Sequence, residues 1–257
     1  FLNELASREG YDLMIRSLKK DIEIFRDENV PLFTQISTEA QRYQQISGAM
    51  TVEVDGKELT LQQASVLLMS TDRKLREDVY HKVTSRRLQD HEELDNLFSS
   101  LIDLRHRVAT NAGFKNFRDY MFRALGRFDY TPQGCFDFHD AIQHEVVPIL
   151  DVFSKDRKAA LQVSALRPWD KAVDPEGRDA LKPFTNGKEL TEKTIEVFRR
   201  LDPFLGQCLT IMKEMGHLDL ESRKGKAPGG YNYPLSEIGV PFIFMNATSS
   251  LRDLVTM

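Results

Sequence analysis

The chain has 257 residues, of which 41% are hydrophobic and 29% are charged, and its formal net charge is −4. This length suits one large domain or two modest ones, and the apolar share allows a real core. The negative charge argues against nucleic-acid binding, which needs a basic face. No apolar run approaches the roughly 20 residues that span a bilayer, which argues against a membrane protein.

The first segments of the chain are expected to be helices followed by one small β-hairpin. Four apolar residues recur at spacings of four, four and three along one helical face: Met14, Leu18, Ile22 and Phe25. Pro31 should end this pattern, and a second helix should run from about residue 32 to 47. Residues 51–60 alternate around Asp55-Gly56, which predicts a hairpin with a tight turn. Thr60 is expected to cap a helix over residues 61–69.

A long helical stretch is expected next. Asp72 is a good N-cap, and the helix that it opens should run with few interruptions to Ala112. Five apolar residues, spaced three or four apart, predict a buried seam against another helix: Leu94, Leu97, Leu101, Leu104 and Val108. A short helix over 117–125 should follow. Thr131-Pro132 then opens a long helix, which Pro148 should kink.

Residues 166–190 provide the best candidate boundary between two lobes, because proline, glycine, asparagine and aspartate accumulate there. We expect an N-terminal helical lobe over 1–165 and the truncated start of a second lobe over 191–257. The second part should hold two helices, a flexible loop, a strand over 240–246 and a helix capped by Ser249 or Ser250. The predicted fold is mostly α, with multi-helix lobes, a small β-hairpin and a short edge-strand region near the C-terminus.

The ends and the cysteines bear on the origin of the chain. It begins at Phe1 and stops at Met257 within an expected helix, so both ends are interpreted as cuts from a larger protein. We expect no signal peptide before Phe1. Cys135 and Cys208 are expected to be small buried thiols of a reducing compartment, which favours a cytoplasmic protein. The single tryptophan, Trp169, is expected to anchor a core or an interface.

The histidines provide no complete metal site. His91-Glu-Glu-Leu-Asp95 and His144-Glu-Val-Val-Pro148 begin like the His-Glu-x-x-His zinc helix, but neither ends in histidine. Zinc binding on a helix needs two imidazoles on one face, four residues apart. We therefore predict no catalytic residue and no metal ligand in this chain, and ordinary surface or boundary positions for its histidines.

The glycine-rich segment Gly225-Lys-Ala-Pro-Gly-Gly230 deserves comparison with a phosphate-binding loop. It lacks the Gly-Lys-Ser/Thr ending that opens a helix beneath the phosphates. The two adjacent glycines are better interpreted as hinges or as places where another backbone comes close. A mobile surface loop is therefore favoured here.

The order of several segments carries a family resemblance. Near the C-terminus these are Lys224-Gly-Lys-Ala-Pro-Gly-Gly-Tyr231, Pro241-Phe-Ile-Phe-Met-Asn246 and Ser249-Ser-Leu-Arg-Asp-Leu-Val-Thr-Met257. Upstream they are Ser70-Thr-Asp-Arg-Lys-Leu-Arg76, Asn111-Ala-Gly-Phe114 with Phe117-Arg-Asp-Tyr120, Arg127-Phe-Asp-Tyr-Thr131 and Leu166-Arg-Pro-Trp-Asp170. The chain thus resembles zinc metallopeptidases of the thimet oligopeptidase and oligoendopeptidase F kind, most of all the second branch.

The resemblance implies a helical, two-lobed enzyme whose deep channel admits only short peptides. It also implies one zinc, held by two histidines of a His-Glu-x-x-His motif and a downstream glutamate. None of these ligands falls on a numbered position here, so zinc is expected in the intact parent and not in this segment, which alone should be inactive. The expected partners are short peptides and the missing C-terminal catalytic half. The alternative is an independent helical peptide-binding or scaffold module without catalysis.

Seven residues are predicted to bind substrate in the intact enzyme: Gly229, Gly230, Tyr231, Phe242, Phe244, Met245 and Asn246. The strand over 242–246 is expected to be an edge strand that pairs with the substrate backbone, since it starts after a proline. The two glycines are expected to move on peptide binding, and replacing both by alanine in the intact enzyme is expected to lower turnover with little loss of folding stability. Apolar surface at 240–245 and after Ser250 is expected to drive self-association of the isolated segment or rearrangement of its last thirty or so residues.

Overall fold

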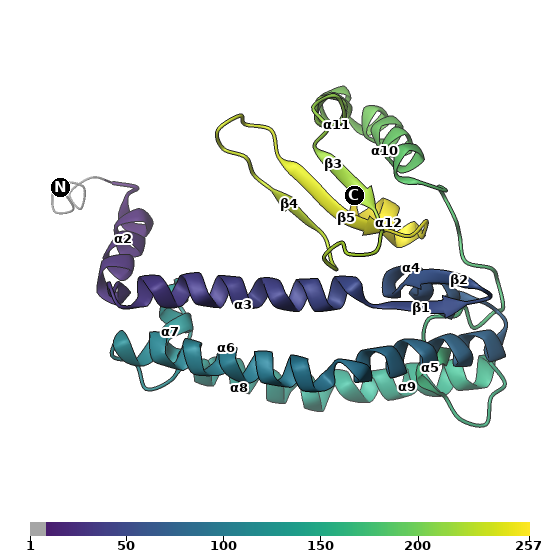
Figure 1. Cartoon of the computed structure of the whole chain (residues 1–257), viewed down its shortest axis with the longest axis horizontal. Helices are drawn as coiled ribbons and strands as arrows, with labels where there is room; N and C mark the ends of the chain where they lie inside the picture. Colours follow the sequence, from purple (N-terminus) through teal and green to yellow (C-terminus); the bar gives the residue numbers. More distant parts are fainter. Residues whose placement is uncertain (1–8) are drawn as a thin grey trace. The chain divides into compact units, whose positions relative to one another are not determined.

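The fold is taken from a computed structural model that describes residues 9–257. The described chain forms two compact units, each assembled from two stretches of sequence (Figure 1). The helical unit holds residues 9–43 and 92–155, and the mixed unit holds residues 44–91 and 156–257. Most of the described chain is helical, with a small two-stranded sheet and a small sheet near the C-terminus, which confirms the predicted fold class.

The helical unit contains helices separated by short turns. Its elements are α2 (Asp12–Ile24), most of α3 (Asn29–Ala49), α6 (His91–Asn111), α7 (Phe117–Ala124), α8 (Pro132–Ala141), the π-helical η2 (Ile142–Val146) and much of α9 (Val147–Ala160). Helix α3 begins three residues earlier than expected, because Pro31 lies in its first turn, where a missing N–H costs no helical hydrogen bond.

The core of the helical unit follows the seam predicted on α6. Leu97, Leu101, Leu104 and Val108 are all buried. Asn29 is also buried: its amide donates to the Val108 carbonyl oxygen at 3.0 Å and its own oxygen accepts from Asn111 at 2.8 Å. Burial of one leucine side chain contributes about 1.5–3 kcal/mol to the free energy of unfolding. The buried residues of the seam therefore contribute a large part of the stability of the helical unit.

The face predicted for the first helix is wrong. Ile15, Lys20 and Ile24 are the buried residues of α2, whereas Met14 is 45% exposed and Ile22 is 66% exposed. The reason is the partner of α2, the short helix α7: the Lys20 ammonium donates to the Ala124 carbonyl oxygen at its end, at 3.0 Å. A tertiary contact made by a lysine therefore sets which face is buried.

Pro148 changes the winding of its helix. It cannot donate to the carbonyl oxygen of His144, and the five residues before Val147 take the π form, which is common where the regular bonding pattern is interrupted. Apolar residues along this helix remain on its surface: Val146, Leu150 and Phe153 are 45%, 53% and 62% exposed.

The mixed unit begins with the predicted hairpin, which is confirmed. Strands β1 (Thr51–Val54) and β2 (Lys57–Thr60) pair antiparallel. Asp55 and Gly56 both have positive φ angles, of 51° and 71°, as the preferred two-residue hairpin turn requires. Thr60 then caps α4 (Leu61–Val66), and its hydroxyl accepts from the backbone N–H of Gln63 at 3.2 Å.

A buried carboxylate ties α5 (Arg73–Gln89) to the segment around η3 (Pro168–Asp170). Asp170 is fully buried and accepts hydrogen bonds from the side chains of Arg73 and Arg76, at 2.9–3.0 Å. Arg157 donates to the Asp170 carbonyl oxygen at 3.2 Å. The two guanidinium groups, led by Arg73, lower the pKa of the Asp170 carboxyl to about 2. Trp169 beside it is buried, as expected for a core anchor.

The second sheet corrects the prediction of an edge strand. Strands β3 (Leu218–Glu221), β4 (Tyr231–Tyr233) and β5 (Phe242–Ala247) form a sheet in the order β3-β5-β4, so β5 is central. It pairs parallel with β3 and antiparallel with β4. Pro241 is compatible with this place because it lies just before the strand and has no ladder hydrogen bond to lose. The two edges of this sheet are formed by β3 and β4.

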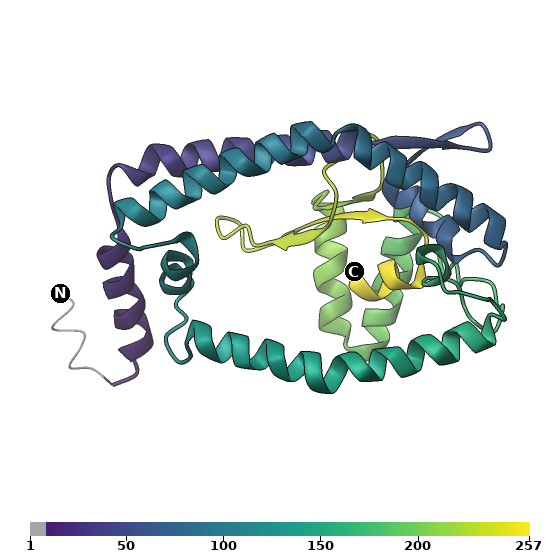
Figure 2. The ribbon, with the colours of Figure 1, turned by 90° about the horizontal axis from the view of Figure 1, so that it is seen from below.

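Helices cover one side of this sheet (Figure 2). Helices α10 (Gly187–Leu201) and α11 (Pro203–Glu214) run side by side, and α12 (Leu251–Thr256) follows β5 directly. Ser250 caps α12, as one of the two predicted caps. Within the described residues, no helix is long and apolar enough to cross a membrane. The predicted lobe boundary at 166–190 falls within the mixed unit and stays a prediction.

The Asp170 cluster predicts a large loss of stability in Asp170→Asn. The change leaves Arg76 buried without its charge partner, which should lower the free energy of unfolding by about 3 kcal/mol. Asp78→Asn on the same helix removes only a surface pair with Lys82 and should cost less than about 1 kcal/mol. Urea unfolding at pH 7 measures both. Equal losses in the two variants would contradict the role given to Asp170.

The same carboxylate predicts a specific acid dependence. Its pKa in the folded chain is lowered, so its stabilisation is complete above about pH 4 and is lost as the pH falls towards 2. The stability advantage of the unmodified chain over Asp170→Asn should therefore shrink by about 2 kcal/mol between pH 5 and pH 2. Urea titrations at several pH values measure it, and a constant advantage would show that ionisation of Asp170 is not involved.

Candidate functional site

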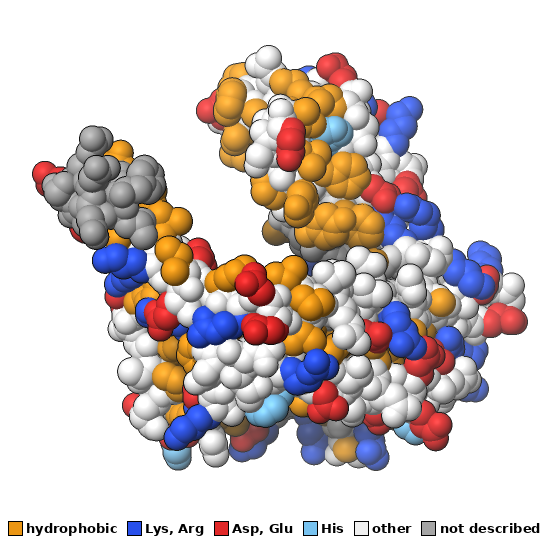
Figure 3. All heavy atoms as spheres, turned by 60° about the vertical axis from the view of Figure 1, so that its left-hand side comes forward, with side chains coloured by type: hydrophobic (Ala, Val, Ile, Leu, Met, Phe, Trp, Pro, Cys, Tyr) orange, Lys and Arg blue, Asp and Glu red, His pale blue; other side chains and the backbone are white. Residues whose placement is uncertain are grey.

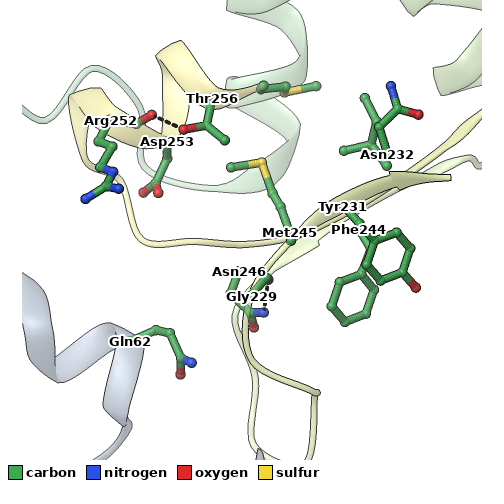
Figure 4. Close-up of a pocket in the computed structure, with 13 residues that line it drawn as sticks. Gln62, Gly229, Tyr231, Asn232, Phe244, Met245, Asn246, Arg252, Asp253 and Thr256 are labelled. Carbon is green, nitrogen blue, oxygen red and sulfur yellow. Dashed lines mark hydrogen bonds between the residues drawn. The ribbon is translucent and has the colours of Figure 1, made fainter. Parts of the chain in front are cut away.

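A pocket of about 450 Å³ lies in the mixed unit between β5, α12 and α4 (Figure 4). Six of the seven predicted substrate residues line it: Gly229, Gly230, Tyr231, Phe244, Met245 and Asn246. Phe242 does not. The structure thus brings the predicted set together, while its contact with a substrate stays a prediction.

The two faces of the sheet differ in chemistry. Tyr231 lies opposite Phe244, and Tyr233 lies opposite Phe242, so these four rings share one face. The rings of Tyr231 and Phe244 stack with centroids 4.9 Å apart and planes 4° from parallel. Met245 points the other way (Figure 4) and belongs to a buried cluster with Phe184, Leu190 and Leu220. Its main role is therefore in the core, with only part of its side chain at the pocket.

The segment before β4 makes specific contacts, and its expected movement on peptide binding stays a prediction. The amide nitrogen of Asn246 donates to the carbonyl oxygens of Ala227 and Gly229, at 2.9 and 2.8 Å. Gly229 has a φ of +93°, which side-chain-bearing residues rarely adopt. A Cβ on Gly230 would lie 3.0 Å from the Phe244 carbonyl oxygen. Both glycines are required by geometry, one by φ and one by a close backbone approach.

Five further lining residues come from segments outside those of the predicted substrate residues: Gln62, Arg252, Asp253, Thr256 and Met257. Gln62 lies on α4, which is held against the loop after β3. The hydroxyls of Thr60 and Ser222 are 3.0 Å apart, and Gln63 donates to the Ser222 carbonyl oxygen at 3.2 Å. Nothing in the sequence pattern links residue 62 to residue 222, so only the fold could reveal it.

Asp253 was detectable from sequence as the third residue after the cap of α12. Its carboxylate accepts from the backbone N–H of Ser250 at 3.1 Å and from the N–H and hydroxyl of Thr248, at 2.7 and 2.9 Å. These bonds stabilise the turn between β5 and α12, where Ser249 has a φ of 72°. Asp253 therefore shapes the pocket, and its carboxylate is occupied by hydrogen bonds within this turn.

Charge at the site is concentrated beside the sheet. Asp219 on β3 pairs with Arg223 and Lys226, and the Arg223 guanidinium is the largest cause that lowers the pKa of this carboxyl to about 2. Burial lowers the pKa of the Lys226 ammonium. Over the rest of the surface in Figure 3, acidic and basic side chains are interspersed without a basic patch on that face.

The histidines lie at exposed or half-buried positions, as expected, and several make local contacts. The rings of His91 and His144 lie 2.7 Å from the carbonyl oxygens of Leu88 and Asp140, and the ring of His217 lies 3.1 Å from that of Pro241. In residues 9–257 no group of three or more His, Cys, Asp or Glu side chains is arranged to hold a metal ion. The residues described here therefore do not fit a zinc site. Cys135 and Cys208 are free and half-buried rather than fully buried.

Comparison with known proteins identifies the fold and the family. The profile of peptidase family M3 matches residues 66–257, so the chain belongs to this family. No curated protein sequence matches the chain.

Solved structures share the fold. A candidate oligoendopeptidase F from Bacillus anthracis strain Ames superposes with a TM-score of 0.88 at 22% identity, over 98% of this chain and 48% of that one. PZ peptidase A, solved with an inhibitor, superposes with a TM-score of 0.88 at 24% identity, over 98% of this chain and 46% of that one. A candidate peptidase from Chlamydophila abortus is more distant, at 0.57 and 15%, over 98% of this chain and 44% of that one. The chain thus spans about half the length of these proteins.

The glycine geometry predicts a folding defect that the sequence alone did not suggest. Gly230→Ala forces a Cβ against the Phe244 carbonyl oxygen, and Gly229→Ala imposes a strained φ, so each should lower the stability of the mixed unit by about 1–3 kcal/mol. Gly134→Ala on α8 meets only an ordinary contact at 3.9 Å and should be neutral or slightly stabilising. Thermal unfolding measures all three. Full stability in both site variants would contradict the constraints on φ and on the backbone approach described here.

Proposed function

We propose that this chain is the segment of a zinc-dependent oligopeptidase that binds and orients short peptides for hydrolysis. Family membership over residues 66–257 carries the proposal. The pocket supports it, because it gathers an apolar stack and several polar groups around backbone from β4 and β5. The intact enzyme is proposed to be a cytoplasmic metalloendopeptidase of the oligoendopeptidase F type.

The free edge of β4 is the better candidate for pairing with a peptide backbone. Since β5 has β3 and β4 on its two sides, the predicted role of its edge passes to the neighbouring strand. All three residues of β4 are exposed. An extended peptide that adds to such an edge gains main-chain hydrogen bonds whatever its sequence, which suits an enzyme that accepts many short peptides.

Zinc is proposed only for the intact parent enzyme. The family resemblance implies a metal that would activate water for attack on the peptide bond. The side chains described here supply no ligand set for it. We therefore assign to this chain only the binding and orientation of the substrate, and no chemical step to its residues.

An independent helical peptide-binding or scaffold module is the alternative function. It would use the same pocket without hydrolysis. The family match over three-quarters of the chain favours the peptidase, whereas a module would explain the pocket equally well. The two differ in whether bound peptide is cleaved by the complete polypeptide.

The proposed function predicts that the complete polypeptide cleaves quenched fluorescent peptides of about ten residues or fewer and loses this activity with a zinc chelator. Added zinc should restore it. The present segment alone should bind the peptides without cleaving them. Peptide binding with no cleavage by the complete polypeptide would favour the scaffold module instead.

Edge pairing predicts a penalty for removing one backbone donor of the substrate. A peptide N-methylated at a residue that pairs with β4 should bind about tenfold more weakly, because one hydrogen bond contributes about 1 kcal/mol and the methyl group also obstructs the edge. A peptide methylated only at its terminal amide is the control. Equal KM values for methylated and parent peptides across a scan of positions would exclude pairing along β4.

A further inference from the structure

The side chain of Lys226 is 2% exposed although the residue lies in the loop between β3 and β4. Its ammonium nitrogen has four oxygen neighbours: the Asp219 carbonyl and carboxylate at 3.0 Å each, the Glu221 carbonyl at 2.9 Å and the Met245 carbonyl at 2.5 Å. The ring of Phe244 lies 4.4 Å away, which adds a cation–π contact. A surface lysine would not be enclosed in this way.

These carbonyl groups surround an irregularity in the sheet. Asp219 pairs with Phe244, but Glu221 pairs with Ala247, so β5 has one more residue than β3 between the two pairs. A bulge of this kind interrupts the ladder and leaves backbone groups without strand partners. Buried carbonyl oxygens need a donor, and the ammonium group with its three N–H bonds supplies it on both strands.

The backbone of Lys226 is held from the opposite side. The N–H of Gly225 donates to the Gly48 carbonyl oxygen at 2.8 Å. A Cβ on Gly48 would lie 2.6 Å from the Lys226 carbonyl oxygen, so the two main chains are in direct contact. The main chain of Lys226 thus rests on the end of α3 while its side chain reaches into the sheet.

Asn246 completes the link in the reverse direction. It follows Met245 in the bulged part of β5, and its side chain donates to the carbonyl oxygens of Ala227 and Gly229. Loop and strand are therefore joined twice, by a loop side chain bound to strand carbonyls and by a strand side chain bound to loop carbonyls. Gly229 and Asn246 line the pocket, whereas Lys226 does not.

We propose that Lys226 is a positioning residue, whose ammonium group holds β5 in its bulged register and thereby sets the pocket in which a peptide substrate binds. The inference rests on the proposed function for the identity of the ligand. Lys226 acts through Asn246 and the Gly229-Gly230 segment, and it touches no substrate. The neighbouring charges fit this role: the Asp219 carboxylate, whose pKa is lowered, stays ionised beside the ammonium, and Arg223 donates to both oxygens of that carboxylate.

The test compares Lys226→Met with Lys224→Met. The first variant keeps an apolar stem and removes the donors. The second removes the exposed ammonium of Lys224, which lies two residues before Lys226 and pairs with Glu58. In this chain, hydrogen exchange of the amides at 227–233 should become at least about tenfold faster in Lys226→Met, and stay within about twofold in Lys224→Met. In the complete enzyme, KM should rise about tenfold in Lys226→Met with kcat little changed, since substrate binding and not the chemical step is affected.

A chemical rescue separates positioning from a general loss of stability. Lys226→Ala should regain its low KM with n-propylammonium, which restores the missing part of the side chain, and not with 1-propanol of the same size. If Lys226→Met does not fold, Lys226→Gln, which keeps an amide donor, takes its place in both arms. A simple structural role would lower the amount of active enzyme and leave KM unchanged.

Two results would overturn the inference. Unchanged exchange at 227–233 in Lys226→Met would show that the ammonium does not hold the loop. Faster exchange with an unchanged KM would show that the loop position does not determine peptide binding. A complete enzyme that cleaves no peptide would instead refute the proposed function, and the exchange comparison would then decide by itself whether Lys226 fixes the loop.

Discussion

Backbone carbonyl groups that lose their ladder partners must be satisfied before a sheet can be buried, and in the mixed unit one lysine performs this task. The bulge in β5 displaces the strand by one residue relative to β3, and the Lys226 ammonium bridges the oxygens on both sides. The contact of Lys226 with Gly48 joins the sheet to the end of α3. Thr60 and Ser222 join the same region to α4.

Local chemistry predicted the elements well. The Asp55-Gly56 turn, the Thr60, Asp72 and Ser250 caps, and the seam on α6 all follow from residue type and spacing, because each involves only neighbours in sequence. The predictions that were wrong concerned partners distant in sequence. The buried face of α2 depends on a lysine contact with α7, and the central place of β5 depends on β4, a three-residue strand too short to show a pattern.

The site shows the same division. Residues of the segments 229–231 and 244–246 could be found because motif order carries a family resemblance, and the structure places them around one pocket. Gln62 lies far away in sequence and carries no motif. Lys226 lies in a basic, glycine-rich segment, a composition that suggests phosphate binding. Its ammonium instead points into the sheet and binds backbone carbonyl oxygens. The role of a charged residue in a glycine-rich loop is therefore ambiguous until the fold shows which oxygen atoms it contacts.

The discontinuous make-up of the mixed unit has a consequence for its biosynthesis. Its hairpin, α4 and α5 end by residue 91, whereas the residues that complete the unit begin at 156. At about 5–20 residues per second, the ribosome needs roughly 3–13 s to make the intervening 64 residues of the helical unit. Throughout that delay Arg76, buried in the folded chain, lacks its charge partner Asp170. The nascent chain is thus exposed to chaperones or to misassociation until the segment that carries Asp170 has emerged.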